Sequence, residues 1–110
     1  MNEASKIMEE VLEDTDFKNL DTKFISNVTA KVENDINKIK SLLIDQISSR
    51  VRWRESILLA EKMGSKTFLE IGNGKVLSGM NKRISKNIST QNLLDMRSIE
   101  QFINSNKDIL

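Results

Sequence analysis

The sequence predicts an α/β fold in which short parallel strands alternate with helices. Apolar residues recur at helical spacing in several segments, which is typical of amphipathic helices. Between two of these segments, the apolar stretch at residues 67–71 is flanked by glycine turns, which is typical of a buried strand. No linker, repeat or low-complexity stretch divides the 110 residues, so we expect one compact unit.

The first half of the chain predicts two helices separated by a strand. The first helix is amphipathic, with an apolar stripe at the i, i+3, i+4, i+7 spacing made of Ala4, Ile7, Met8, Val11 and Leu12. Residues 23–30 (KFISNVTA) are rich in β-branched residues, which favours a strand. Asn34 is expected to cap the second helix, which ends near Ser48. The apolar face of that helix comprises Ile36, Ile39, Leu43 and Ile47.

The second half predicts a strand–helix unit. A helix over about residues 51–63 is expected to stop at Gly64, because glycine tolerates the left-handed conformation that follows a helix end. The strand at residues 67–71 then leads through a turn bracketed by Gly72 and Gly74 into another helix. The apolar stripe of this helix comprises Val76, Leu77, Met80 and Ile84.

A further strand and a last helix complete the pattern. The strand is expected over residues 90–94, and the helix begins at Ser98, which forms a capping box with Gln101. Strands that alternate with helices in this way imply right-handed crossovers and a small parallel sheet covered on its faces.

Composition excludes several classes of chemistry. With no cysteine and no histidine, the chain lacks disulfides, thiolate nucleophiles, the commonest general base and the commonest transition-metal ligand. We therefore expect no metal site and no cofactor. Its apolar runs of four residues or fewer are far too short to span a bilayer, so no membrane association is expected. The N-terminal region carries Glu3, Glu9 and Glu10 where a secretory signal would be basic and then apolar, which favours a cytoplasmic location.

Charge is sorted along the chain although the net charge is only +1. Residues 1–21 carry seven acidic side chains and two lysines, whereas residues 50–86 carry nine basic side chains and three glutamates. A nucleic-acid-binding domain would be more basic overall, so this asymmetry favours a local basic face that binds an acidic protein. No nucleic-acid partner is expected.

Two local patterns resemble functional motifs, but an ordinary structural role explains each of them better. Arg50, Arg52 and Arg54 surround Trp53 as in single-strand nucleic-acid platforms, but one aromatic residue is no platform. We expect a helix start there, with Trp53 buried and Arg52 making structural hydrogen bonds. The G-N-G-K sequence at residues 72–75 lacks the spacing and the following Ser or Thr of a phosphate-binding loop, so nucleotide binding is rejected.

Three ordered blocks carry a resemblance to a known family. The first is S-N-V-T-A at residues 26–30, and the second comprises Gln46, Ser49, Val51, Arg52, Trp53, Glu55 and Ser56. The third comprises Glu70, Gly72, Gly74, Lys75, Val76, Leu77, Gly79, Lys82 and Arg83. In these blocks and their spacing the chain resembles the C-terminal part of bacterial malonyl-CoA:acyl carrier protein transacylases, over nearly all of its length. It departs from the family pattern at Arg50 and Asn73, where prolines are usual.

The resemblance implies a single partial domain over residues 1–110, a fragment of the α/β-hydrolase-like large subdomain of an acyltransferase of fatty acid biosynthesis. The family's catalytic serine, arginine and histidine would lie upstream of Met1. Within the chain no G-x-S-x-G elbow surrounds Ser65 or Ser78. We therefore expect the chain to be inactive alone, with malonyl-CoA as a substrate only if the missing N-terminal part is supplied.

The resemblance also implies roles for individual residues. The backbone carbonyl of Gln46 would orient the absent histidine, and Lys82 with Arg83 would dock the acidic acyl carrier protein. The alternatives without a functional role are that Gln46 is simply a polar residue in a helix and that Lys82 and Arg83 belong to a solvated helix face. Alternative functions are a noncatalytic module that binds an acidic protein such as acyl carrier protein, or an inert truncated fragment. Strands near Phe24 and Phe68 would present unpaired edges, so self-association is expected.

Overall fold

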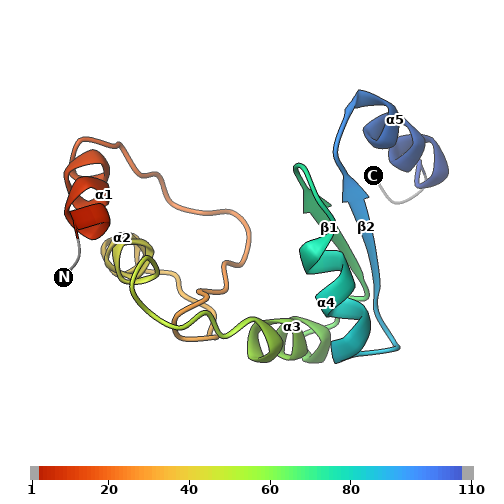
Figure 1. The fold of residues 1–110 in the computed structure, drawn as a ribbon, viewed down its shortest axis with the longest axis horizontal. Helices are drawn as coiled ribbons and strands as arrows, with labels where there is room; N and C mark the ends of the chain where they lie inside the picture. Colours follow the sequence, from red (N-terminus) through yellow and green to blue (C-terminus); the bar gives the residue numbers. More distant parts are fainter. Residues whose placement is uncertain (1–2, 108–110) are drawn as a thin grey trace. The chain divides into compact units, whose positions relative to one another are not determined.

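A computed structural model describes residues 3–107, and in them the chain forms five α-helices and two β-strands (Figure 1). This content confirms the predicted α/β class. The chain divides into two compact units, Met1–Leu59 and Ala60–Leu110, and helix α3 (Trp53–Lys62) begins in the first and ends in the second. That residues 1–110 form a single partial domain stays a prediction. Met1 itself lies outside the described residues.

The first unit is built on two helices that pack side by side, α1 (Glu3–Glu13) and α2 (Ile36–Asp45) (Figure 1). Both helices were predicted. The cap of α2 was misplaced by one residue: Asp35, not Asn34, is the N-cap, because its Oδ1 accepts from the N–H groups of Asn37 at 2.9 Å and Lys38 at 3.4 Å. The helix ends at Asp45, and turns continue through residue 48.

The predicted strand at residues 23–30 is wrong. The segment makes only one antiparallel bridge, between Ile25 and Val32, and residues 27–29 form a turn. The turn closes because Ala30 donates its N–H to the Ser26 carbonyl at 2.9 Å, with Ala30 in the left-handed region at φ +53°. These local hydrogen bonds override the β-propensity of the side chains.

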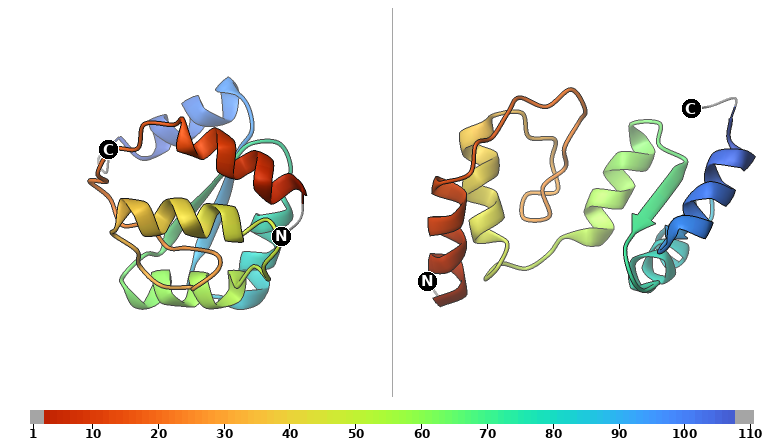
Figure 2. Two further views of the ribbon diagram at one scale, coloured as in Figure 1. Left: turned by 90° about the vertical axis from the view of Figure 1, so that its left-hand side faces the viewer. Right: turned by 90° about the horizontal axis from the view of Figure 1, so that it is seen from above.

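The second unit is a parallel strand–helix–strand unit followed by a helix (Figure 2). Strand β1 (Thr67–Ile71) pairs with β2 (Ser89–Leu93) in the register Thr67 to Ser89 and Ile71 to Leu93. Helix α4 (Val76–Ile84) connects the two strands, and both α4 and α5 (Met96–Ser105) contact β2. The predicted β1 and α4 are confirmed, and β2 starts one residue earlier than predicted. The handedness of the crossover stays a prediction.

Two details of the second unit correct the sequence-based expectations. The sheet is not covered on both faces, because Leu69 is 40% exposed and Ile71 is 78% exposed, on the face opposite to that of Phe68 and Glu70. The last helix begins earlier than Ser98: Asp95 is the N-cap, and Ser98 is the N3 partner of the capping box. Ser98 therefore occupies the N3 position of the capping box and not the expected N-cap position.

The buried apolar core is small. Among residues 3–107 it consists of Ile39, Leu42 and Ile57 in the first unit and Leu93 in the second. The expected stop of α3 is confirmed, with Gly64 at φ +105° two residues past the helix. None of the helices within residues 3–107 has the length and apolar content needed to cross a bilayer.

Candidate functional site

Gln46 lies at the C-terminal end of α2, in the first unit. Its backbone remains helical, with φ −58° and ψ −29°. Beyond it the chain tightens, because Ile47 donates its N–H to Ile44 at 3.3 Å and Ser48 donates to Asp45 at 3.2 Å. The carbonyl oxygens of Ile44 and Asp45 are therefore occupied. The carbonyl oxygen of Gln46 accepts no hydrogen bond from any donor of residues 3–107.

A shallow hollow of about 230 Å³ lies beside Gln46. Its lining is otherwise apolar and comes from α1 and from α2 with the turn that follows it: Met8, Leu12, Leu43 and Ile47. The C-terminus of a helix carries the negative end of the helix dipole, so a hydrogen-bond donor or a cation is favoured there. The Gln46 carbonyl is thus an available acceptor at a site that suits a donating or cationic group.

Arg52 connects the first two family-like blocks. Its N–H donates to the Asn27 carbonyl at 2.8 Å, and its Nη1 donates to the Thr29 carbonyl at 3.1 Å. Its Nη2 forms an ion pair with Glu55, and the hydrogen bond from Arg52 lowers the pKa of that carboxyl. The Arg52 carbonyl accepts from the Ser56 hydroxyl at 2.8 Å. The expected structural role of Arg52 is confirmed. Trp53 is only half-buried.

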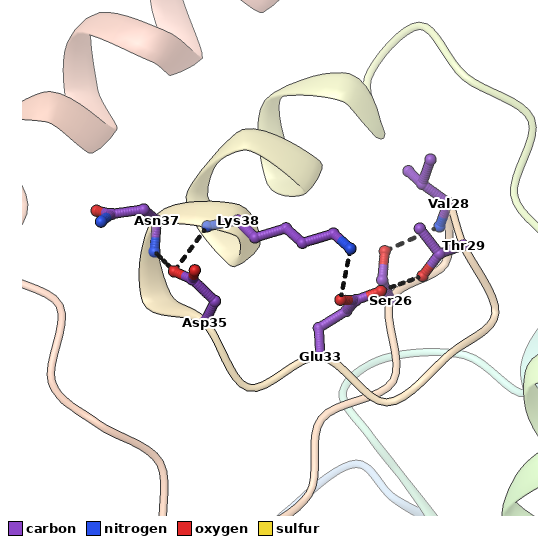
Figure 3. A network of polar contacts seen from close by, with 7 residues as sticks. All are labelled: Ser26, Val28, Thr29, Glu33, Asp35, Asn37 and Lys38. Carbon is purple, nitrogen blue, oxygen red and sulfur yellow. Dashed lines mark hydrogen bonds and ion pairs between the residues drawn. The ribbon is translucent and has the colours of Figure 1, made fainter.

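Glu33 forms the centre of a polar network at the start of α2 (Figure 3). Although charged, it is only 6% exposed. The Thr29 hydroxyl donates to its Oε2 at 2.9 Å, and Lys38 Nζ lies 3.2 Å from its Oε1. The hydrogen bond from Thr29 and then the interactions with Lys38 lower the pKa of Glu33. The network fixes the loop that carries the first block against α2.

The N-terminus of α4 is capped by a carboxylate from β1. Lys75 is the N-cap residue, but its side chain makes no capping hydrogen bond. Instead, Glu70 Oε1 accepts from the Ser78 N–H at 2.9 Å and the Ser78 hydroxyl at 2.6 Å, while Oε2 accepts from the Leu77 N–H at 3.2 Å. These bonds, the hydroxyl bond first, lower the pKa of Glu70. Glu70 therefore replaces the missing cap from another element.

The same arrangement explains the glycine turn. Gly72 has φ +131° and Gly74 has φ +105°, conformations that L side chains rarely adopt, and they return the chain so that α4 starts over Glu70. A phosphate bound at this helix start would compete for the N–H groups that the carboxylate already occupies. The geometry thus supports the rejection of nucleotide binding at residues 72–75.

Lys82 and Arg83 lie in the last turn of α4, in the second unit, and both are exposed. Neither forms an ion pair with another of residues 3–107. Cations near a helix C-terminus are stabilised by the helix dipole. This position therefore also fits the alternative that the two residues are simply part of a solvated helix face. Their charges are therefore available to an external anion.

No grouping of three or more acidic, histidine or cysteine side chains that would suit a metal ion occurs among residues 3–107. In chemical terms, the described part of the chain offers an available carbonyl acceptor in the first unit and an exposed cationic pair in the second. Neither feature breaks or forms covalent bonds by itself.

No family model matches the chain, but related sequences do. A malonyl CoA-acyl carrier protein transacylase of Bacillus subtilis is 43% identical over 110 residues, covering 98% of this chain and 34% of the relative. The chain is homologous to part of the malonyl CoA-acyl carrier protein transacylases. A transacylase of the same name from Haemophilus influenzae is 33% identical over 82 residues, covering 72% of this chain and 26% of the relative. The chain thus spans about a quarter to a third of the length of these curated relatives.

Solved structures of transacylases share the fold. An acyl-carrier-protein-S-malonyltransferase from Bartonella henselae matches with a TM-score of 0.83 and 35% identity, over 93% of this chain and 32% of that one. A malonyl-transacylase in complex with its type II PKS acyl-carrier protein matches with a TM-score of 0.82 and 31% identity, over 94% of this chain and 33% of that one. The interpretation of the chain as a piece of such an α/β-hydrolase-like enzyme is confirmed.

Sequence reasoning missed two carboxylates that organise these regions. Glu70 was noted only as a member of the third block, and no role was predicted for Glu33. A signal existed for Glu70: an acid two residues before a glycine turn that precedes a helix without a capping side chain. For Glu33 the signal was weaker, a threonine four residues before it.

Proposed function

We propose that this chain is the C-terminal part of a malonyl-CoA:acyl carrier protein S-malonyltransferase of fatty acid biosynthesis. In such an enzyme the malonyl group passes from coenzyme A to a serine and then to the thiol of the carrier protein. The observation that carries the proposal is the structural match to an S-malonyltransferase over 93% of the chain. A cytoplasmic location belongs to the same proposal.

Gln46 is proposed to orient the catalytic histidine through its backbone carbonyl. A histidine that donates its Nδ1 proton to this oxygen keeps Nε2 unprotonated, so that Nε2 takes the proton of the serine nucleophile. The C-terminus of α2 also stabilises the imidazolium that forms. The absence of a competing donor at this oxygen within residues 3–107 supports the assignment.

A chimaera tests this role, with residues 1–110 replacing the aligned third of the Bacillus subtilis relative. Gln46→Ala keeps the carbonyl, and we expect malonyl transfer close to that of the parent chimaera. Ile47→Pro removes the N–H that bonds Ile44 and moves Gln46 out of the helical region, which redirects the carbonyl. We expect this variant to lose most of its turnover while still folding by circular dichroism. Equal turnover of a folded Ile47→Pro chimaera and the parent would refute the assignment.

Lys82 and Arg83 are proposed to dock the acidic acyl carrier protein. Both are exposed and without an ion pair inside residues 3–107, so their charges remain available to a partner. The solved complex of a related transacylase with its acyl-carrier protein supports this partner. Electrostatic attraction of the carrier protein by such a pair acts over a long range and weakens as the salt concentration rises.

Charge reversal tests the docking. Each exposed ion pair contributes about 0.2–1 kcal/mol, and reversal adds a repulsion of similar size, so Lys82→Glu with Arg83→Glu should weaken carrier binding roughly tenfold. The matched control is Lys62→Glu with Lys66→Glu, two exposed lysines of the same unit whose reversal changes the net charge equally. Calorimetric titration with an acyl carrier protein measures both. If the two double variants lose the same affinity for the carrier protein, the effect comes from net charge alone, and a specific docking site at Lys82 and Arg83 is refuted.

The chain by itself is proposed not to transfer malonyl groups, because it contains no histidine to act as the base. Purified chain should give no transfer above a control without protein. Carrier binding without turnover would favour the alternative of a noncatalytic binding module. The exposed cations of α4 support this alternative. Loss of both properties would favour an inert fragment.

A further inference from the structure

We propose that Glu70 is a positioning residue for carrier docking, because it holds α4 in the orientation that presents Lys82 and Arg83. The inference rests on the docking function proposed above. It adds a carboxylate on β1, whose own charge would repel an acidic partner, to a site made of cations on α4.

Apolar packing holds α4 only weakly. The helix has nine residues, fewer than an isolated helix needs to be stable in water. None of its apolar side chains is fully buried, since Val76 is 72% exposed, Leu77 36% and Met80 39%, and Ile84 is partly exposed. Polar contacts from neighbouring elements must therefore supply much of what fixes its orientation.

Such contacts occur at both ends of α4. At the start, Glu70 accepts three hydrogen bonds from the backbone and hydroxyl groups of Leu77 and Ser78, at 2.6–3.2 Å. Toward the end, Asn81 Nδ2 donates to the Thr90 hydroxyl of β2 at 3.0 Å. Asn81 is only 2% exposed and directly precedes the cationic pair.

Through Glu70, β1 contacts the start of the helix. Without it, the N–H groups of Leu77 and Ser78 lose their acceptor and Lys75 offers no substitute cap. The first turn of α4 then frays, and the cationic pair samples several orientations. Carrier binding has to order the helix again, which lowers the affinity.

The sign of the effect separates positioning from simple electrostatics. Glu70→Gln makes the second unit more positive by one charge, so long-range attraction alone predicts tighter binding of an acidic carrier. Positioning predicts weaker binding, by about threefold to tenfold, the range expected for loss of a helix N-cap. The matched control is Glu100→Gln, which removes an exposed acid of α5 in the same unit.

The experiment is calorimetric titration of the full 110-residue chain with an acyl carrier protein, alongside circular dichroism. We expect weaker binding for Glu70→Gln and unchanged or slightly tighter binding for Glu100→Gln. Ser78→Ala removes the 2.6 Å bond without changing charge and leaves two backbone donors on Glu70, so it should weaken binding less. This variant decides the question if Glu70→Gln does not fold. Unchanged or tighter binding by the folded Glu70→Gln chain, or by Ser78→Ala in its place, would overturn the inference.

A double-mutant cycle distinguishes this inference from the docking proposal itself. If Glu70 acts through the cations, its effect should fall below twofold when Lys82 and Arg83 are alanine. An undiminished effect in that background would show that Glu70 acts elsewhere, and the inference would fail. If instead the Lys82→Glu with Arg83→Glu variant binds as the parent does, the docking proposal fails first.

Discussion

Replacing Arg52 with alanine should destabilise the first unit by about 1.5 kcal/mol. The side chain donates from Nη1 to the Thr29 carbonyl at 3.1 Å, and hydrogen bonds of charged donors contribute about 1.5–3 kcal/mol. The side chain is 42% exposed, so water competes and the lower end of that range applies. The backbone bond to Asn27 survives any side-chain change. The exposed ion pair with Glu55 adds little.

Urea unfolding followed by the fluorescence of Trp53 measures the effect, because Trp53 is the single tryptophan of the chain and follows Arg52 directly. A loss of about 1.5 kcal/mol lowers the folded-to-unfolded ratio roughly tenfold and the urea midpoint by about 1 M. Arg52→Lys keeps a charge near Glu55 but lacks the planar fork that serves both acceptors, so it should lose most of the same energy. Glu55→Gln removes the ion pair alone and should have a small effect. If Arg52→Ala costs no more than Glu55→Gln, the hydrogen bond to Thr29 does not stabilise the unit.

Three further outcomes are expected. The pKa of the Glu33 carboxyl is lowered in the fold, so its ionised form stabilises the protein above about pH 4.5, the ordinary pKa. This stabilisation is lost as the pH falls through the lowered pKa, and unfolding measured across the acid range should show the loss. Glu33→Gln should remove this part of the pH dependence of stability. Ala30→Gly relieves the left-handed backbone at φ +53° and should raise the urea midpoint, whereas Ala60→Gly inside α3 should cost about 1 kcal/mol. Sedimentation velocity should show self-association that diminishes in Ile71→Lys, since Ile71 is 78% exposed, and a parent chain that stays monomeric at high concentration would contradict this.

The elements that sequence predicted well are those whose pattern is local. β1 and α4 carry a short apolar run, two glycines and a helical stripe, and each feature acts within a few residues. Residues 23–30 were mistaken for a strand because β-branched side chains also occupy turns when a serine accepts from the backbone, as Ser26 Oγ does from Val28 at 3.1 Å. Asn34 and Asp35 are both capping residues, so only geometry decides between them.

The candidate site was predictable only in part. The positions of Gln46, Lys82 and Arg83 followed from the family resemblance, and the structure shows an available carbonyl at the first and exposed charges at the other two. The role of Glu70 was not predictable from periodicity, because its partner Ser78 lies eight residues away across a turn. An acid two residues before the glycine turn is a signal for such a contact, but the path that the two glycines give to the chain decides whether the carboxylate reaches the start of α4.

In each unit, hydrogen bonds to the main chain fix the backbone of the family-like blocks. Arg52 binds the carbonyls of Asn27 and Thr29, and Glu70 binds the N–H groups that open α4. Such bonds define where the backbone runs, so they tolerate a change of neighbouring side chains. Asn73 in place of the usual proline fits this view, because the glycines on either side set the turn. If a carbonyl and a helix end are what this part of a transacylase contributes, then the side chains that matter most are those that fix the backbone, and substitutions at Arg52 and Glu70 should impair function more than one at Gln46 itself.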